Sequence, residues 1–367
     1  MSWRSHQAEQ ELATWLGRDH AVLTGNGTTA LWAVLSALGL PAGASVLYPD
    51  LTCATAINAA IFADLRPRFA DVRPETAEPT PGDLAAAAAA CGAGACVPTR
   101  LFGRCGPLGP DLGRCPQIVD AAQGAPDARA AAGGLAAIVS FGPGKQLDLG
   151  GGGAIATDDA ELARDCRLLL CTIGGDRQRA AAARDELMRE LVLLGRESPA
   201  GTPAHASRRA ALLRRHRSGY LAPPPPELPA RLLAGLAGQP ERMRRRHARA
   251  RALADALGPV PGVRLLDLGS RDVPWRVSFA VAADARDPVL LALTALDCAP
   301  GRLFAPAHRL AGLPDGDFPM AAALADTLVN LDPDRLGDDA PTAALRAAAA
   351  TAAALAGPVR KVEHAGT

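Results

Sequence analysis

The chain has 367 residues, of which 49% are hydrophobic and 21% charged, and this composition is typical of a soluble globular enzyme with more than one domain. Its formal net charge of +1 and its aromatic content of 4% give no electrostatic or stacking basis for nucleic-acid binding. No apolar run approaches the about 20 residues of a membrane helix and the amino terminus carries no secretion signal, so we expect a cytoplasmic protein without membrane contacts.

Short β-like runs alternate with helical stretches between residues 20 and 170. One helix is predicted from about Thr28 to Leu38. A second helix is predicted after the strand at 45–49 and runs through Ile57. The predicted strands have these bounds: 21–25, 45–49, 66–72, 95–102, 117–122, 136–141 and 153–159. Strands separated by crossover helices favour an α/β fold with a mostly parallel sheet covered by helices. Binding groups are then expected at the carboxyl ends of the strands.

The chain becomes arginine-rich beyond residue 172 and proline-rich at 223–229, which we interpret as a hinge or loop region. A helical run is predicted from Glu227 to Leu257. Strands at 262–268 and 273–281, helices at 289–296 and 320–331 and an alanine-rich tail helix at 341–356 follow. We therefore predict a large domain at 1–240 and a smaller α+β domain at 241–367.

The eight cysteines form no CxxC pair and no cluster with histidines, so we expect free thiols and no metal site.

Lysine is even more informative than cysteine. Lys145 and Lys361 are the two lysines among 39 basic residues. Arginine stays protonated and cannot form an imine, whereas a partly desolvated lysine can act as a nucleophile or a base. Lys145 is therefore our candidate catalytic residue.

Three further segments can be understood together with this lysine. Gly27, Thr28 and Thr29 form a glycine turn between a strand and a helix, which presents N–H groups, a helix dipole and hydroxyls to a phosphate. Asp120 ends an apolar strand, where a buried carboxylate needs a cation, and a protonated pyridine nitrogen would fit. Four glycines at 150–153 let the backbone pass close to a bound ring.

Two other classes of protein compete with this interpretation. Gly25, Gly27 and Ala30 also form a GxGxxA pattern with Asp50 twenty residues further on, which is typical of dinucleotide binding and predicts an NAD-dependent oxidoreductase. An NAD-dependent oxidoreductase would give Lys145 no role. A non-catalytic regulator with the same fold would have no need of the lysine and the buried acid.

Five segments resemble those of the DegT/DnrJ/EryC1/StrS family of pyridoxal-phosphate-dependent sugar aminotransferases. Residues 26–31 are similar to the SGTxAL turn of that family, and 49–58 to its PxFTFxATxN stretch. The motifs LFG at 101–103, DAAQ at 120–123 and SFxxxK at 140–145 match in order and spacing. The resemblance implies the type I aspartate aminotransferase fold, whose large domain holds a mostly parallel, seven-stranded sheet.

The resemblance also implies a role for each matching residue. Lys145 would form a Schiff base with pyridoxal 5'-phosphate, and Asp120 would hold the pyridine nitrogen protonated. Gln123 would contact the ring hydroxyl, and Cys53 takes the place of the aromatic residue that usually stacks on the ring. The turn and one further hydroxyl residue would bind the phosphate: Gly27, Thr28, Thr29 and Ser140.

The chain departs from the family at two places. Arg100 stands where a histidine usually precedes LFG, and it is either a substrate contact or a sheet-edge arginine. Ser218 to Ala222 is all that remains of the GYNxR segment, which the neighbouring subunit normally lends to the site. We treat Arg100 and Ser218 as candidate substrate residues, and the arginine-rich stretch 208–217 as a second source of cations.

We therefore predict a pyridoxal-phosphate-dependent aminotransferase of secondary-metabolite biosynthesis. The resemblance implies glutamate or glutamine as amino donor, and a keto-sugar, a cyclitol or a related small molecule as oxo acceptor. The alternative on the same scaffold is another reaction of this cofactor, such as dehydration, cyclisation or elimination. The type I fold also implies a homodimer, in which Ser218 to Ala222 would cross to the partner.

Overall fold

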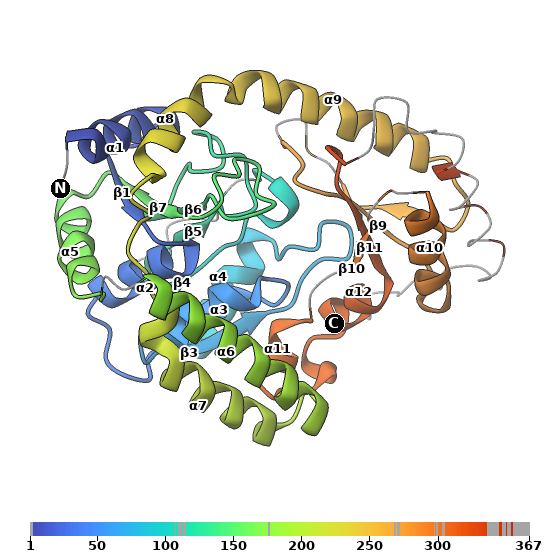
Figure 1. Ribbon diagram of the computed structural model, residues 1–367. Coiled ribbons are helices and arrows are strands. Elements are labelled where there is room, and N and C mark those ends of the chain that lie inside the picture. The colour runs from blue at the N-terminus through green and yellow to red at the C-terminus, as the bar shows by residue number, and fades with distance from the viewer. Residues whose placement is uncertain are drawn as a thin grey trace.

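The computed structural model describes residues 3–335 except 107, 109–111, 113–114, 175–176, 268, 270–271, 297, 299 and 303–304, together with residues 345, 346, 350 and 354. Figure 1 shows a central sheet surrounded by helices and, on the other side of the molecule, a second sheet near the carboxyl end of the chain. The long helix α9 (Gln239–Leu257) runs along the molecule from the side of α8 to the side of the second sheet (Figure 1).

The strands predicted in the first half of the chain form the central sheet. They are β1 (His20–Thr24), β2 (Ser45–Pro49), β3 (Arg66–Ala70), β4 (Ala93–Cys96), β5 (Ile118–Asp120), β6 (Ala136–Ser140) and β7 (Gly153–Thr157). Four strands lie in the order β1-β7-β6-β5 and three in the order β3-β2-β4. Parallel bridges from Cys96 to Gln117 and from Thr99 to Asp120 join the two groups. β7 is antiparallel to both neighbours and the other pairs are parallel, which confirms the predicted sheet.

Successive side chains of a strand point to opposite faces, and here they enter two different cores. Ile138 and Ile155 belong to the core that contains α2, α3 and α5, while Val139 and Ala156 belong to the core that contains α1 and α8. The sheet is therefore covered on both sides, as predicted. The helices of this part are α1 (Trp3–Leu16), α2 (Gly27–Ala37), α3 (Ala54–Phe62), α4 (Pro81–Cys91), α5 (Ala160–Cys171) and α8 (Leu228–Ala237).

The structure corrects the interpretation of the arginine-rich stretch as a loop. It contains a helical hairpin of α6 (Arg177–Glu197) and α7 (Pro203–Tyr220), which lies beside α3 in Figure 1. Arginine and alanine favour helices, and the hydroxyl of Thr202 caps α7 by accepting from the His205 N–H. Buried Leu187 and Leu213 attach the hairpin to the main core.

The carboxyl-terminal part forms a four-stranded sheet in the order β10-β11-β9-β8. Its elements are β8 (Arg264–Leu265), β9 (Val277–Ala280), α10 (Ala283–Ala295), β10 (Gly301–Arg302), α11 (Ala307–Leu310), α12 (Pro319–Thr327) and β11 (Leu328–Leu331). Two predictions are corrected here. The helix predicted at 227–257 is divided at Gly238 into α8 and α9, and the helix predicted at 320–331 ends at Thr327, because 328–331 pairs with β9 and β10.

The domain boundary between residues 240 and 241 stays a prediction, and it falls within the first turn of α9. The predicted tail helix at 341–356 lies largely outside the described residues. Within the described part of the chain, every helix is too short or too polar to cross a membrane.

Candidate active site

Side chains from separate segments line one cavity of about 410 Å³ at the carboxyl ends of the central strands. The turn after β1, the loop after β2, the end of β5 and the loop after β6 all contribute to it. Most of the predicted cofactor residues meet here: Gly27, Thr28, Cys53, Asp120, Gln123, Ser140 and Lys145. The cavity lies where a mostly parallel sheet is expected to bind its ligand.

The glycine turn places the amino terminus of α2 against the end of β6. The Asn26 side chain caps α2 by accepting from the Thr29 N–H at 2.8 Å. A Cβ atom at Gly27 would lie 3.2 Å from the Ser140 Cβ, so only glycine brings backbone so close to that residue without displacing it. Helix N–H groups and the hydroxyl-bearing residues Thr28 and Ser140 therefore border the same end of the cavity, which suits an anion.

Thr29 does not line this cavity, although the sequence predicts that it binds phosphate. Its side chain is fully buried, and its hydroxyl accepts from the Ala222 N–H at 3.3 Å. The position of Thr29 therefore supports a structural role in fixing the segment around Ala222.

Asp120 is a buried carboxylate at the base of the cavity, with 6% of its surface exposed. Its Oδ1 accepts from the Ala122 N–H at 3.0 Å. None of the ion pairs between described residues includes it. Burial raises the pKa of Asp120, and the Ala122 N–H and the charge of Lys145 only partly oppose this. A buried carboxylate without a cation is costly, so this position is suited to a cationic group of a ligand.

Lys145 follows β6 in a tight loop and is half-buried. Its Nζ lies 5.0 Å from the centre of the Trp275 ring, within the range of a cation–π contact. The indole N–H of Trp275 donates to the Gly144 carbonyl at 2.7 Å, so the same ring also holds the backbone of the loop. Gly144 has a φ of 76°, which favours glycine at this position.

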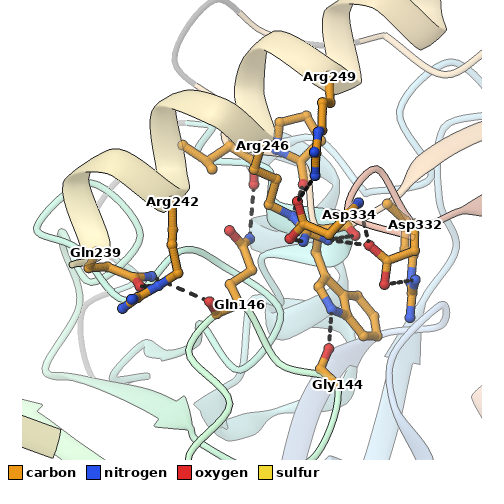
Figure 2. A network of polar contacts seen from close by, with 12 residues as sticks. Gly144, Gln146, Gln239, Arg242, Arg246, Arg249, Asp332 and Asp334 are labelled. Atoms are coloured by element: carbon orange, nitrogen blue, oxygen red, sulfur yellow. Dashed lines mark hydrogen bonds and ion pairs between the residues drawn. The ribbon is translucent and has the colours of Figure 1, made fainter. Parts of the chain in front are cut away.

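A polar network connects the lysine loop to the carboxyl-terminal part of the chain. Figure 2 shows Gln146 of the loop beside Gln239 of α9, whose amide donates to the Gln146 carbonyl at 3.5 Å. Further along α9, Arg246 pairs with Asp332 at 3.0 Å and also donates to the Trp275 carbonyl (Figure 2). The orientation of the lysine loop therefore depends on contacts from residues more than ninety positions away.

Gln123 and Cys53 complete the predicted lining. The side-chain oxygen of Gln123 accepts from the Phe102 N–H at 3.0 Å, which leaves its amide nitrogen as the group that can donate to a ligand. Cys53 precedes α3, and its Sγ lies 3.1 Å from the Thr55 hydroxyl. A thiol is smaller than an aromatic ring, so a planar ligand would meet a polarisable sulfur here instead of a stacking partner.

The model of the DegT/DnrJ/EryC1/StrS aminotransferase family matches residues 4–195. The chain belongs to this family. It is 32% identical over 170 residues to the GDP-perosamine synthase of Caulobacter vibrioides, and this match spans 44% of the chain and 46% of that protein. The chain thus matches about half the length of this curated relative.

Solved structures of the family agree with the fold of the whole chain. DesI, solved in the presence of its TDP-sugar product, has a TM-score of 0.71 at 25% identity, with 97% of this chain and 87% of DesI covered. Spr1654 of Streptococcus pneumoniae, solved in its PLP-form, has a TM-score of 0.74 at 14% identity, with 97% and 92% covered. The type I fold implied by the sequence motifs is therefore confirmed.

The two candidate substrate residues, Arg100 and Ser218, do not line the cavity that contains Lys145. Arg100 is 6% exposed, lines a different cavity and donates to the carbonyls of Gly106 and Ala132. Ser218 lines a third cavity beside Trp32. Neither residue lines the cavity of Lys145, so this cavity gives the two assignments no support and both stay predictions.

The segment from Ser218 to Ala222 contacts its own chain. The Asn26 amide donates to the Tyr220 carbonyl at 3.4 Å, and the Tyr220 side chain lines the cavity and hydrogen-bonds Thr28. Burial raises the pKa of Tyr220. The segment therefore has contacts within its own chain, and its crossing to a partner subunit stays a prediction.

Several residues of the site were not predicted from the sequence, and four of these lie beyond residue 145. They are Arg184, Met188, Tyr220 and Trp275. Only Tyr220 carried a signal, because it lies in the remnant of the GYNxR segment. The first two belong to α6, which the sequence did not predict, and the tryptophan reaches the lysine only through tertiary packing.

Proposed function

We propose that this chain is a pyridoxal-phosphate-dependent aminotransferase. The observation that carries the proposal is the placement of the amine of Lys145 and the buried, uncompensated carboxylate of Asp120 in one cavity. The anion-binding turn at Gly27 and Thr28 borders the same cavity. This cofactor requires three kinds of group: an amine for its aldehyde carbon, an acid for its ring nitrogen and hydrogen-bond donors for its phosphate.

The residues present therefore fit the cofactor. Thr28, Ser140 and the backbone of Gly27 would bind its phosphate, Asp120 its ring nitrogen, and Gln123 its ring hydroxyl. When bound, the cofactor supplies an electron sink for the bonds at the substrate α-carbon. Its positive ring nitrogen would also remove the cost of burying Asp120, so binding should stabilise the fold.

The chain's own part in the reaction is attachment, orientation and proton transfer. The Lys145 amine would attach the cofactor, and the freed amine would accept the proton that leaves the substrate α-carbon and hold it for return. Trp275 and Gly144 hold the loop that carries this amine. Tyr220 and Met188 border the cavity and reduce the access of water.

The substrates follow from the family and remain part of the proposal. GDP-perosamine synthase is named for a GDP-linked sugar, and DesI was solved in the presence of its TDP-sugar product. A keto-sugar or a related oxo compound such as a cyclitol is therefore the acceptor class. We propose glutamate or glutamine as donor and a role in secondary-metabolite biosynthesis. Dehydration, cyclisation or elimination on the same scaffold is the alternative.

We also propose a homodimer, on the basis of an apolar surface near the cavity. Met188, Val192 and Leu193 of α6 and Leu168 of α5 are each at least half exposed. Met188 also lines the cavity, so a second copy seated on α6 would cover the opening. Light scattering at assay concentrations tests this, and a fully active monomer would contradict it.

The function is tested by adding glutamate to the cofactor-loaded chain in the absence of an acceptor. An aminotransferase releases about one 2-oxoglutarate per chain and then stops, because the amino group stays on the enzyme. Asp120→Asn should keep the fold, measured by circular dichroism, and slow this burst by at least about 100-fold. A dehydratase or an elimination enzyme would release no 2-oxoglutarate, and a normal burst in Asp120→Asn would remove the role of the acid.

A further inference from the structure

All five arginines of α7 have partners within the chain. Arg208 pairs with Glu197, Arg215 with Glu190, Arg214 and Arg217 with Asp64, and Arg209 donates to Asn58. These contacts hold α6, α7 and the edge of the central sheet together. The stretch 208–217 therefore supplies structural cations, and none of these side chains lines the cavity of Lys145.

Arg184 differs from all of them. It lies on α6, one turn before Met188, and both residues line the cavity, so this face of the helix is turned toward the cavity. Arg184 is exposed, and no ion pair between described residues includes it. Its positive charge opposes the effect of burial on the pKa of the Tyr220 phenol, and both residues line the same cavity.

The charges of the cavity leave one role for this side chain. Lys145 and Arg184 are the cationic side chains among the described lining residues, and Asp120 is the acid. In the proposed function Lys145 is attached to the cofactor and Asp120 faces its ring nitrogen. Arg184 then remains without a counterion, although a guanidinium in a cavity is suited to bind planar oxyanions through two parallel hydrogen bonds.

We propose that Arg184 is the anion-recognition residue of this cavity and binds an oxyanion group of a bound small molecule. The shared chemistry is a phosphate or a carboxylate, and its source is either the cofactor phosphate or a carboxylate of the amino donor. This inference rests on the proposed function, since it takes the roles of Lys145 and Asp120 from there. It makes α6 the element that selects charged ligands.

Calorimetric titration of the full chain with two probes that cannot react tests this inference. Inorganic phosphate, titrated without cofactor, represents the cofactor phosphate. Glutarate, titrated into the cofactor-loaded chain, represents the dicarboxylate donor. The variants are Arg184→Gln, which removes the charge, and Arg184→Lys, which keeps the charge without the planar fork. Arg189→Gln is the matched control, because Arg189 is exposed on the same helix and, among the described residues, donates only to the Asp185 carbonyl.

We expect Arg184→Gln to weaken the binding of one probe by at least about tenfold, Arg184→Lys to weaken it less, and Arg189→Gln to leave it unchanged. Weaker phosphate binding identifies the cofactor phosphate as partner, and weaker glutarate binding identifies the donor. Unchanged binding of both probes in a folded Arg184→Gln, or an equal loss in Arg189→Gln, overturns the inference. Neither probe turns over, so failure of the proposed aminotransfer would leave this result intact.

Discussion

His308 should be a strong determinant of stability because it connects two parts of the chain inside the protein. It lies on α11 with 0% exposed side chain, between Asp50 at the end of β2 and Asp315. Its Nδ1 lies 2.6 Å from Asp50 Oδ2, and its Nε2 lies 2.8 Å from Asp315 Oδ1. Asp50 is equally buried and precedes Cys53 by three residues, so this contact supports one wall of the cavity.

The magnitude follows from the burial of both partners. In His308→Gln the carboxylate of Asp50 stays buried without a cation, and breaking a buried pair in this way costs about 3–5 kcal/mol. Burial by itself lowers the pKa of His308, but hydrogen bonds to Asp50 and Asp315 and their charges raise it above its usual value of 6.5. The stabilisation by His308 is therefore complete when the pH is below the usual pKa of histidine. It is lost as the pH rises through the raised pKa of His308 in the folded protein.

Urea unfolding followed by circular dichroism at about pH 6 and about pH 9 measures this effect. Arg309→Gln is the control, because Arg309 pairs with the same Asp315 at the surface and should cost at most about 1 kcal/mol. The expected result is a large loss of stability in His308→Gln at the lower pH and a smaller loss at the higher pH. A loss no greater than that of the control, or an equal loss at both pH values, would refute the reasoning.

Two further predictions concern the surroundings of the site. Burial raises the pKa of Glu78 from 4.5 to about 7, although the charge of Arg104 opposes this shift. The contribution of Glu78 to stability should therefore fall as the pH rises from about 5 to about 7. In Glu78→Gln the melting temperature, measured by calorimetry, should depend less on pH in this range. A Cβ at Gly25 would lie 2.1 Å from the Ala222 carbonyl oxygen. Gly25→Ala should therefore lower both the melting temperature and the affinity for cofactor. Gly106→Ala is the control and should lower neither, because a Cβ at Gly106 has no atom within 4 Å. An unchanged cofactor affinity in Gly25→Ala would show that the packing of Ala222 does not shape the cavity.

The central sheet could be predicted because its signals are local. Period-two and continuous apolar runs mark the strands, and a residue such as Asp120 at the end of a buried strand has few structural reasons to be there. The rarity of lysine directed attention to Lys145 without any structural information. Sheet topology then brings the ends of β5 and β6 together, so the Asp120 and Lys145 side of the cavity follows from the sequence.

The remaining part of the site depends on tertiary contacts that leave no local signal. The helix α6 is so rich in arginine that charge hides its periodicity, and Arg184 was missed with it. Trp275 lies within the strand predicted at 273–281, and its contact with Lys145 arises from the packing of the carboxyl-terminal part against the lysine loop. Arg100 is the converse case, since its position in a motif left a substrate contact and a sheet-edge arginine open, and its side chain lines a different cavity.

The most direct test of the central claim is to locate the amine that carries the cofactor. The chain is loaded with pyridoxal phosphate, reduced with borohydride, digested and analysed by mass spectrometry. Because the chain has two lysines, Lys145 and Lys361, peptide mapping distinguishes the possible sites without ambiguity. The account predicts a phosphopyridoxyl adduct on Lys145 and its loss in Lys145→Ala. An adduct on Lys361, or no adduct on either lysine, would contradict it.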